Sequence, residues 1–479
     1  MIRLKLPKYY LTLSILLSIF CYSTVNAQNV NDALRLGLPG LGSSARALGM
    51  GNSYLALSDD ASAAYFNPAG FGLIKRLEIS GGLNYNSFNN STTFMRDVSS
   101  YSNSSTRLDR LSFAFPFPTI RGSLVFGLSY HTSKDFTHAL KFSGFNNGSN
   151  SMIQDLLSTD VPYDLYLTDN DNNTPINGRL HQSGDVLSSG SINNWTFSGA
   201  IEISKNLYFG LNLSVISGAF ERNRDYYEDD TQNIYQGETA AGEPQTDDFK
   251  TFYLNNLLNW NLSGWDAKIG LIYQINTYAR FGATVQFPKT FYVKEKFMVD
   301  GSSEFGTGKV YNLDRDKYSD AVEYDIITPF SIGSGFSVNY KGFILSGEAT
   351  FTDYTQLKFE NPKALSAQYI SGINKDIKDL LRPAVNLNVG LEYTIPVVDV
   401  RLRGGFFIKP SAYKDDPSDY DKKYVTAGIG FLTEETIGID LGFAHGWWKD
   451  FGDNYGFDVS RTHQDITVNH LILGVTYRF

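Results

Sequence analysis

Apolar and polar side chains alternate with a period of two residues in many separate stretches of this chain. In residues 470–479, the odd positions carry Leu, Val, Tyr and Phe, whereas the even positions are mostly polar or small. The same alternation returns in residues 207–214, 386–393 and 437–444. This period is that of a β-strand whose two faces meet different surroundings. Many such strands in series predict an all-β protein.

Fourteen strand candidates follow one another along the chain. They lie near residues 76–85, 108–116, 122–132, 193–204, 206–217, 265–275, 278–287, 327–339, 342–352, 384–394, 398–408, 423–432, 436–446 and 467–479. Long connections are expected at 86–107, 133–192, 218–264, 288–326, 353–383, 409–422 and 447–466, and short ones at 117–121, 205, 276–277, 340–341, 395–397 and 433–435. An even strand count with long loops at one end is typical of a transmembrane antiparallel β-barrel. We predict that fold, with about fourteen strands, rather than a soluble β-sandwich or propeller.

The N-terminal residues indicate export. Arg3, Lys5 and Lys8 precede an apolar run, and Val25-Asn26-Ala27 fits a cleavage site before Gln28. The apolar run is shorter than the ~20 residues that a membrane-spanning helix needs. We therefore predict a signal peptide at residues 1–27 rather than a membrane anchor. The only cysteine, Cys21, lies within it, so the mature chain would contain no thiol.

Composition narrows the class further. The chain has 41 Lys and Arg against 50 Asp and Glu, a net charge of −9, and no basic cluster. Nucleic acid is therefore not an expected partner. Past the signal peptide, no apolar run reaches the ~18 residues of a helical membrane span. An exported chain rich in Tyr, Phe, Gly, Asn and Ser fits the outer membrane of a Gram-negative bacterium, with outer-membrane lipid around the barrel.

Residues 46–72 differ from the strands that follow. The stretch is rich in Gly, Ala and Ser, and it ends in an Asn-Pro-Ala-Gly sequence. If the short turns are periplasmic, both ends of the barrel domain lie on that side. A barrel of about fourteen strands is too wide for its own side chains to fill. Residues 28–75 are thus expected to plug the lumen, and residues 76–479 to form the barrel.

The same stretch resembles a known family. Gly49-Met50-Gly51, Asp59-Asp60-Ala61-Ser62 and Asn67-Pro68-Ala69-Gly70 are similar to the N-terminal hatch of the FadL/OmpP1/TodX outer-membrane transporters. Tyr477-Arg478-Phe479 resembles the C-terminal signature that the barrel-assembly machinery reads. The resemblance implies passive uptake of hydrophobic molecules such as long-chain fatty acids or aromatic hydrocarbons. They would be captured in the outer loops, pass the hatch, and leave sideways at an inward kink in the third strand.

The resemblance assigns each of these roles to particular residues. Asp59 or Asp60 is expected to cap a short helix that ends before Pro68, and the glycines to permit tight turns. Whether this segment is a moving gate or a fixed stopper stays open. The hatch or gate residues are Gly49, Gly51, Asp59, Asp60, Asn67, Pro68, Ala69 and Gly70.

Three further groups of residues are candidates. Gly122 and Gly127 mark a possible kink in the third strand, because Gly within a strand often marks a bend. Apolar clusters in exposed loops need a partner, either one another or a greasy ligand. The loop candidates are Met152, Leu156, Leu157, Phe252, Tyr253, Leu257, Leu258 and Trp260. Inward-facing charges are expected to pair between hatch and wall, or to meet a substrate carboxylate; they include Glu78, Lys268, Arg280, Glu348, Arg401 and Arg403.

Catalytic, metal and cofactor motifs are not found. The six His form no HExxH pattern, and Gly49-Met50-Gly51 is followed by Tyr54 where a dinucleotide-binding loop needs Gly. Asp169, Asp171 and Asn173 begin like a calcium loop but lack its Gly and its closing Glu. We expect no enzyme. Two other functions stay open, namely an accessory barrel of type IX secretion and a surface structure or adhesin.

Overall fold

The computed structural model describes residues 29–479 apart from 238–240, 243, 397 and 434–435. The predicted signal peptide lies outside the described residues. The strands are β1 (Glu78–Phe94), β2 (Asp97–Phe117), β3 (Leu124–Asp135), β4 (His138–Phe145), β5 (His181–Ser204), β6 (Leu207–Asp229), β7 (Phe249–Gln274), β8 (Ala279–Gln286), β9 (Thr290–Phe305), β10 (Val310–Asn312), β11 (Ser319–Ile327), β12 (Ser331–Tyr340), β13 (Phe343–Asp353), β14 (Lys358–Lys363), β15 (Pro383–Ile395), β16 (Val400–Lys409), β17 (Lys422–Thr433), β18 (Ile437–Asp453) and β19 (Arg461–Arg478).

Short helices occur in the N-terminal segment and in the longer loops. Among the described residues, no helix is long and apolar enough to cross a membrane. The helices are α1 (Val30–Gly37), α2 (Ala45–Gly49), η1 (Ala61–Ala64), η2 (Pro68–Leu73), α3 (Met152–Asp155), η3 (Leu156–Ser158), α4 (Val161–Asp164), η4 (Pro244–Thr246), η5 (Tyr354–Gln356), α5 (Ala367–Leu380), η6 (Ser418–Tyr420) and η7 (Asp458–Ser460).

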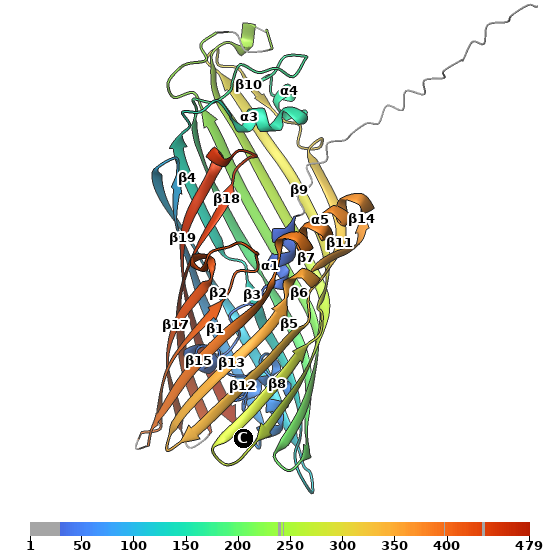
Figure 1. Ribbon diagram of the computed structural model, residues 1–479, viewed down its shortest axis with the longest axis vertical. Helices are drawn as coiled ribbons and strands as arrows, with labels where there is room; N and C mark the ends of the chain where they lie inside the picture. Colours follow the sequence, from blue (N-terminus) through green and yellow to red (C-terminus); the bar gives the residue numbers. More distant parts are fainter. Residues whose placement is uncertain (1–28, 238–240, 243, 397, 434–435) are drawn as a thin grey trace, which may run out of the picture.

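The strands form a closed antiparallel barrel (Figure 1). The ring closes where β1 pairs with β19, from Glu78 opposite Arg478 to Thr93 opposite His463. Four pairs of segments, namely β3 and β4, β8 and β9, β11 and β12, and β13 and β14, continue one another along the same course, and β10 is a short addition to β9. The barrel therefore has fourteen strands, which confirms the predicted fold class.

The two faces of the sheet have the polarity that the alternation predicts. In β19, Leu473 and Val475 are exposed on the outside, where lipid would lie, whereas His470 faces inward and is buried. Among the inward residues of β1, Ser80 and Asn84 are buried. An apolar exterior around a partly polar interior is the pattern of an outer-membrane barrel.

Several strands extend beyond the predicted bounds. Residues 86–107, predicted as a long loop, continue β1 and β2, and a two-residue turn at Met95 and Arg96 joins them. Both turn residues have positive φ, 49° and 81°, as the tight turns of β-hairpins require. The prediction was wrong because the outward side chains of this part are Ser, Thr and Asn. Above the apolar band, both faces of a strand meet water, and the alternation disappears.

The other long connections also contain regular structure. Residues 133–192 include β4, α3, α4 and the outer half of β5, and residues 218–264 are largely the outer halves of β6 and β7. Residues 288–326 contain β9 and β11, and residues 353–383 contain β14 and α5. The barrel therefore stands far higher on its long-loop side than the fourteen predicted strands would make it.

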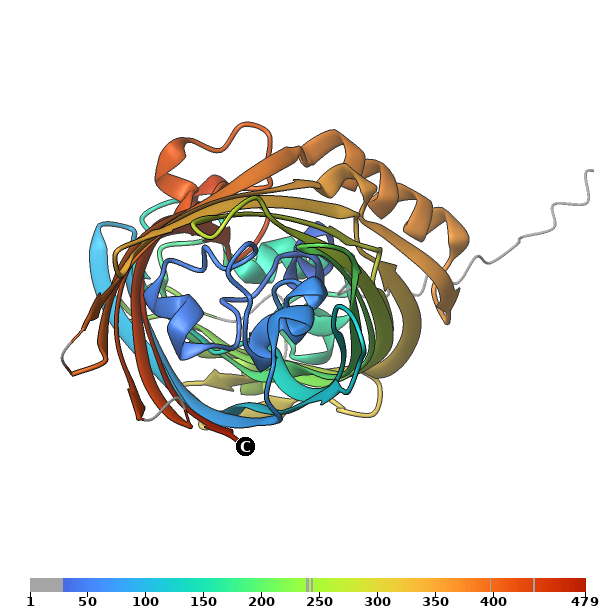
Figure 2. The same ribbon diagram turned by 90° about the horizontal axis from the view of Figure 1, so that it is seen from below.

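The N-terminal segment, residues 29–75, lies inside the ring of strands (Figure 2); we call it the hatch. Inward-facing glycines on the wall let the hatch backbone approach closely. A Cβ placed on Gly210 of β6 would lie 2.3 Å from the backbone of Pro68 and Ala69. A Cβ on Gly390 of β15 would lie 2.2 Å from the carbonyl oxygen of Met50. The hatch can therefore pack closely against the wall because these wall residues are glycines.

This fit makes Gly210→Ala a test of hatch packing. We expect the added methyl group to lower the free energy of unfolding by about 1–3 kcal/mol, because backbone atoms must move to admit it. The matched control is Gly347→Ala, since no heavy atom lies within 4 Å of a Cβ at that position. Urea unfolding of the purified barrel in detergent, followed by tryptophan fluorescence, measures both. Equal effects of the two substitutions would contradict the close contact.

Candidate functional site

The Asn-Pro-Ala-Gly sequence of the hatch begins a short 3-10 helix. The Asn67 side chain accepts a hydrogen bond from the Ala69 N–H at 3.1 Å, and Pro68 occupies the first turn of η2. The Asn67 amide also donates to the carbonyls of Leu55 (2.9 Å) and Leu271 (3.2 Å). One side chain therefore caps a helix, joins two parts of the hatch, and ties both to β7. An Asn at this position does what Ala or Leu cannot.

The other predicted hatch residues serve turns and caps. The Asp60 side chain caps η1 by accepting from the Ser62 N–H at 2.8 Å. Gly51 has a positive φ of 62°, and a Cβ on Gly70 would lie 1.7 Å from the Ser58 carbonyl oxygen. A Cβ on Gly49 would lie 3.0 Å from Gly428 of β17. These positions form the compact body of the hatch.

Arg46 is the centre of an ion-pair network between hatch and wall. Its guanidinium lies 3.0 Å from Glu392 of β15 and 2.8 Å from Asp59. Asp59 also pairs with Arg280 of β8 at 3.1 Å. Burial raises the pKa of the Asp59 carboxyl, but Arg46 and Arg280 outweigh this effect and hold the pKa well below its usual range. A buried ion pair costs a great deal to break from one side, so the network fixes the hatch in place.

The remaining predicted lumen charges lie in or beside similar contacts. Glu348 accepts from the N–H groups of Tyr54 and Leu55, both at 3.0 Å. Glu78 accepts from the Ala61 N–H at 2.8 Å and pairs with Arg478. Lys268 donates to the Tyr65 carbonyl.

The rest of these charges lie on the wall. Arg403 pairs with Glu392 and Asp440, each at 2.6 Å, and Arg401 lies beside that network. In this structure, the predicted lumen charges other than Arg401 have protein partners, most of them between hatch and wall.

The interior changes character towards the long-loop end. Above the charged region, α1 lies within a large apolar cluster that we call the inner chamber. Val30, Leu34 and Leu36 of α1 pack there against strands of the wall and against α5. Ile370, Ile373 and Ile377 of α5 close the chamber from the side. Their spacing of three and four residues is a helix signal that strand counting passes over.

A second apolar cluster, the cap, covers the outer end. Met152 of α3 and Phe252 of β7 are buried in the cap, and Leu156 packs against it. Leu157 is half-buried in η3. Of the predicted loop candidates, these are the ones at the outer end near α3 and α4 (Figure 1).

The residues from Phe252 to Trp260 do not form a loop, which corrects the prediction. They belong to β7, where alternate side chains face opposite sides. Leu258 and Trp260 consequently line the inner chamber, whereas Tyr253 and Leu257 are half-buried on the other face. The stretch contains three Asn side chains beside its apolar ones, and this mixture is also typical of a loop.

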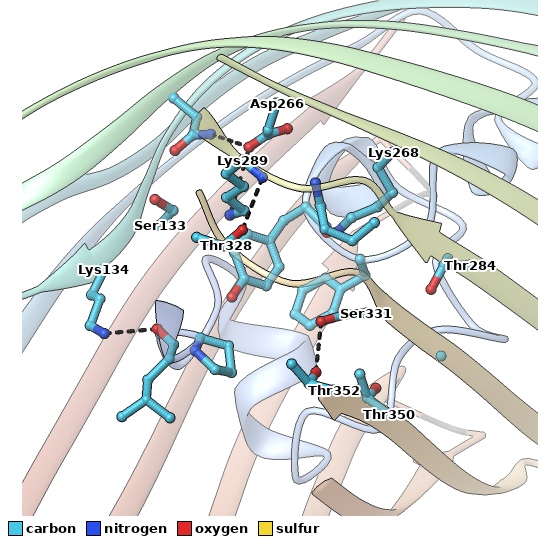
Figure 3. Close-up of a pocket in the computed structure, with 18 of the residues that line it drawn as sticks. Ser133, Lys134, Asp266, Lys268, Thr284, Lys289, Thr328, Ser331, Thr350 and Thr352 are labelled. Atoms are coloured by element: carbon cyan, nitrogen blue, oxygen red, sulfur yellow. Dashed lines mark hydrogen bonds and ion pairs between the residues drawn. The ribbon is translucent and has the colours of Figure 1, made fainter. Parts of the chain in front are cut away.

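A cavity of about 200 Å³, lined by polar and apolar side chains, lies between the inner chamber and the lower hatch (Figure 3). The ammonium group of Lys289 lies 3.6 Å from Asp266, and Lys134 donates to the Leu38 carbonyl at 2.7 Å. The hydroxyls of Ser331 and Thr352 lie 2.7 Å apart. The interior is therefore apolar above, mixed in the middle, and ionic below.

The barrel wall contains a seam between the second and third strands. β2 pairs with β3 only over Arg110–Phe117, opposite Leu124–His131. Beyond His131, the third strand pairs only with β5, and its register shifts between Thr132 and Lys134. β4 then pairs with β5 and not with β2.

The third strand therefore changes course at residues 132–137, which corrects the predicted kink at Gly122 and Gly127. Gly122 lies in the turn before β3, with a φ of 69°. Gly127 pairs regularly with Ala114 and faces the ring of Phe71. The hatch ring explains this glycine, because a Cβ there would lie 2.4 Å from it.

Side chains close the seam, and we call Ser105, Arg107 and Asp135 the seam latch. Asp135 accepts from Arg107 Nε at 2.7 Å and from the Ser105 hydroxyl at 2.8 Å. Thr132 adds a hydrogen bond from its hydroxyl to the Leu108 carbonyl at 2.9 Å. No backbone ladder crosses the wall at this level in the described chain. The seam is thus the weakest joint between β2 and its neighbours.

Comparisons with known proteins agree with this geometry. Residues 41–479 match the family model described as outer membrane protein transport protein (OMPP1/FadL/TodX). The toluene transporter TodX of Pseudomonas putida has a similar fold, with a TM-score of 0.55 and 13% identity over 92% of this chain and 99% of that one. A Pseudomonas aeruginosa FadL homologue gives a TM-score of 0.56 and 12% identity over 92% and 98%. The comparison with curated proteins gives no match.

The ion-pair network leads to a prediction for Arg46→Ala. We expect a higher single-channel conductance in planar bilayers, because the substitution removes the link between the hatch and β15. Glu392 keeps Arg403 and Asp59 keeps Arg280 as partners, so the barrel should still fold. The control is Arg461→Ala, which removes an ion pair with Asp453 at the exposed outer end. An unchanged conductance of Arg46→Ala would mean that this network does not hold the hatch.

Proposed function

Because this chain belongs to the outer membrane protein transport family (OMPP1/FadL/TodX), we propose that it is an outer-membrane channel for passive uptake of hydrophobic molecules. The family is one of transport channels and not of enzymes. Long-chain fatty acids and aromatic hydrocarbons are the substrate classes we propose. In this proposal the long-loop end faces the outside of the cell, and the short turns face the periplasm.

The inner chamber is the observation that carries the proposal. A channel for water-soluble solutes has a polar lumen, whereas the upper lumen here is lined by Leu258, Trp260, Phe291 and other buried apolar side chains. The cap above it is equally apolar and contains Met152 and Phe252. A hydrophobic molecule captured in the cap would keep apolar contacts as it moves inward.

The arrangement below the chamber supports sideways release rather than passage straight down. A molecule moving down past the hatch would meet the charged side chains of the cavity, such as Asp266 and Lys289, and then the ionic network around Arg46. Exposing about 200 Å² of apolar surface to water costs about 5 kcal/mol. The seam avoids that cost, because it lies beside the chamber.

The level of the seam also supports release into the membrane. Leu108 and Leu111 are exposed on the outer surface just below the latch, whereas Thr106 and Ser104 above it are polar. A substrate leaving at this height would enter the upper edge of the apolar band. We propose that opening of the seam latch lets it out.

An uptake assay tests the function. We expect a deletion strain to lose at least tenfold in its initial uptake rate of a radiolabelled long-chain fatty acid or aromatic hydrocarbon, and the wild-type gene to restore it. Secretion of surface proteins and adhesion should not change. Normal uptake with failed secretion would favour the accessory function in protein secretion, and normal uptake with failed adhesion a surface structure.

A cross-link across the seam tests the route. Arg107→Cys with Asp135→Cys would give the only thiols of the mature chain if residues 1–27 are removed. We expect a short bifunctional maleimide between them to lower uptake at least tenfold, because the latch can no longer open. The control is the pair Lys449→Cys with Asp465→Cys, which lie opposite each other on β18 and β19. Full uptake through the cross-linked seam would place the exit elsewhere.

A further inference from the structure

Four buried side chains line the cavity of Figure 3, which we call the middle cavity, and each has a polar atom without a hydrogen-bond partner in the described chain. They are Asn52 of the hatch, His131 of β3, Asn194 of β5 and Asn212 of β6. All four are more than nine-tenths buried. The atoms are Oδ1 of the three asparagines and Nδ1 of His131. Polar atoms that are buried in this way normally have a partner, so they point to a ligand with matching groups.

The orientation of two of these amides is fixed by bonds from their nitrogen atoms. Asn212 donates from Nδ2 to the Ala64 carbonyl at 2.6 Å, and Asn194 donates from Nδ2 to Asp266 at 3.1 Å. Their Oδ1 atoms are therefore acceptors, and only an O–H or N–H group can satisfy them. His131 lies opposite Asn194 in the pairing of β3 with β5. The wall thus presents several acceptors on neighbouring strands.

The charged side chains of the middle cavity already have partners, which limits the charge of a ligand. Lys289 pairs with Asp266 at 3.6 Å. Lys134, Lys268 and Lys409 each donate to a carbonyl group of the hatch. These lysines would repel a cationic group, and a carboxylate brings acceptors but no donors. The middle cavity therefore fits an uncharged group with several O–H donors.

The middle cavity also has an apolar side, where it meets the inner chamber. Leu36, Ile192 and Phe291 line the cavity and belong to the chamber cluster as well. The cavity volume of about 200 Å³ is far larger than the ~30 Å³ that one water molecule occupies in the liquid. A ligand with its polar end among the asparagines would therefore keep its apolar end against the chamber.

We propose that the middle cavity is a head-group site for an uncharged amphiphile whose head carries several hydroxyl groups, such as a monoacylglycerol. This inference rests on the proposed uptake function and specifies its substrate class. The hydroxyl groups of the head donate to the amide oxygens of Asn194 and Asn212, and the acyl chain lies along Leu36 and Phe291. A fatty acid anion or a hydrocarbon of equal length lacks these donors.

Equilibrium binding to the purified full barrel in amphipol tests the proposal. The probe is radiolabelled 1-monolauroylglycerol, and the competitors are laurate and dodecane, which have the same chain length. We expect monolauroylglycerol to bind at least tenfold more tightly than either competitor, because only its head satisfies the amide oxygens.

Two substitutions remove the unpartnered atoms one at a time. We expect Asn212→Leu to weaken binding of monolauroylglycerol at least tenfold and His131→Phe at least threefold, with less than a twofold change for dodecane. His131→Phe keeps a ring against Tyr65, whose centroid lies 5.6 Å from that of His131, so it is the variant that disturbs packing least. Slow migration of the unheated protein on gels reports that each variant forms a barrel.

Ser198→Ala is the matched control. The Ser198 hydroxyl is also buried and unpartnered in the described chain, but it does not line the middle cavity. Its removal should leave binding of monolauroylglycerol within twofold of the wild type.

Two results would overturn the head-group site alone. One is binding of laurate or dodecane as tight as that of monolauroylglycerol. The other is unchanged binding of monolauroylglycerol to folded Asn212→Leu and His131→Phe, which would leave the unpartnered atoms to water. Failure of the proposed uptake function gives a different result, since the barrel would then bind none of the three ligands and a deletion strain would take up hydrophobic molecules normally.

Discussion

The structure depends on one constraint, that every backbone N–H and C=O group inside a bilayer must find its partner within the protein. A sheet meets this constraint only by closing, and here the closure is the pairing of β1 with β19. Fourteen strands around the ring then enclose a lumen too wide to be filled by wall side chains. The hatch occupies that lumen, with its α1 in the upper part, and α5 closes the upper part from the side.

The filling of the lumen is graded, and each level has its own chemistry. Ion pairs around Arg46 hold the lowest level, polar and apolar side chains together surround the cavity at the middle level, and apolar side chains form the inner chamber above. This gradient runs along the axis of the barrel. The region most favourable to an apolar molecule therefore lies next to the seam and not next to the periplasm.

The fourteen strands could be predicted from the sequence because lipid imposes a period of two on every strand that crosses it. The same physics explains where prediction stopped. Above the lipid, Ser87 and Asn89 face water on the outside, and polar residues also face inward, so this part of β1 lacks the alternation and its sequence predicts a loop. Hatch motifs around Asn67 were found because caps and tight turns restrict residue type. Arg46 was missed, since a lone arginine has no local signal and its partner Glu392 is distant in sequence. The course of the third strand follows from which strand it pairs with, and neither Gly122 nor Gly127 could reveal that.

The contact between Arg46 and Glu392 spans 346 positions of the chain. Contacts of such long range form late in folding, because the intervening chain must first be ordered. The hatch is synthesised first, whereas β15 and β16, which it contacts in the barrel, are synthesised near the end of the chain. Enclosure of the hatch and closure of the ring must therefore belong to one late step of assembly. A barrel that closed before the hatch was in place would enclose a lumen whose glycines and buried charges had no partners.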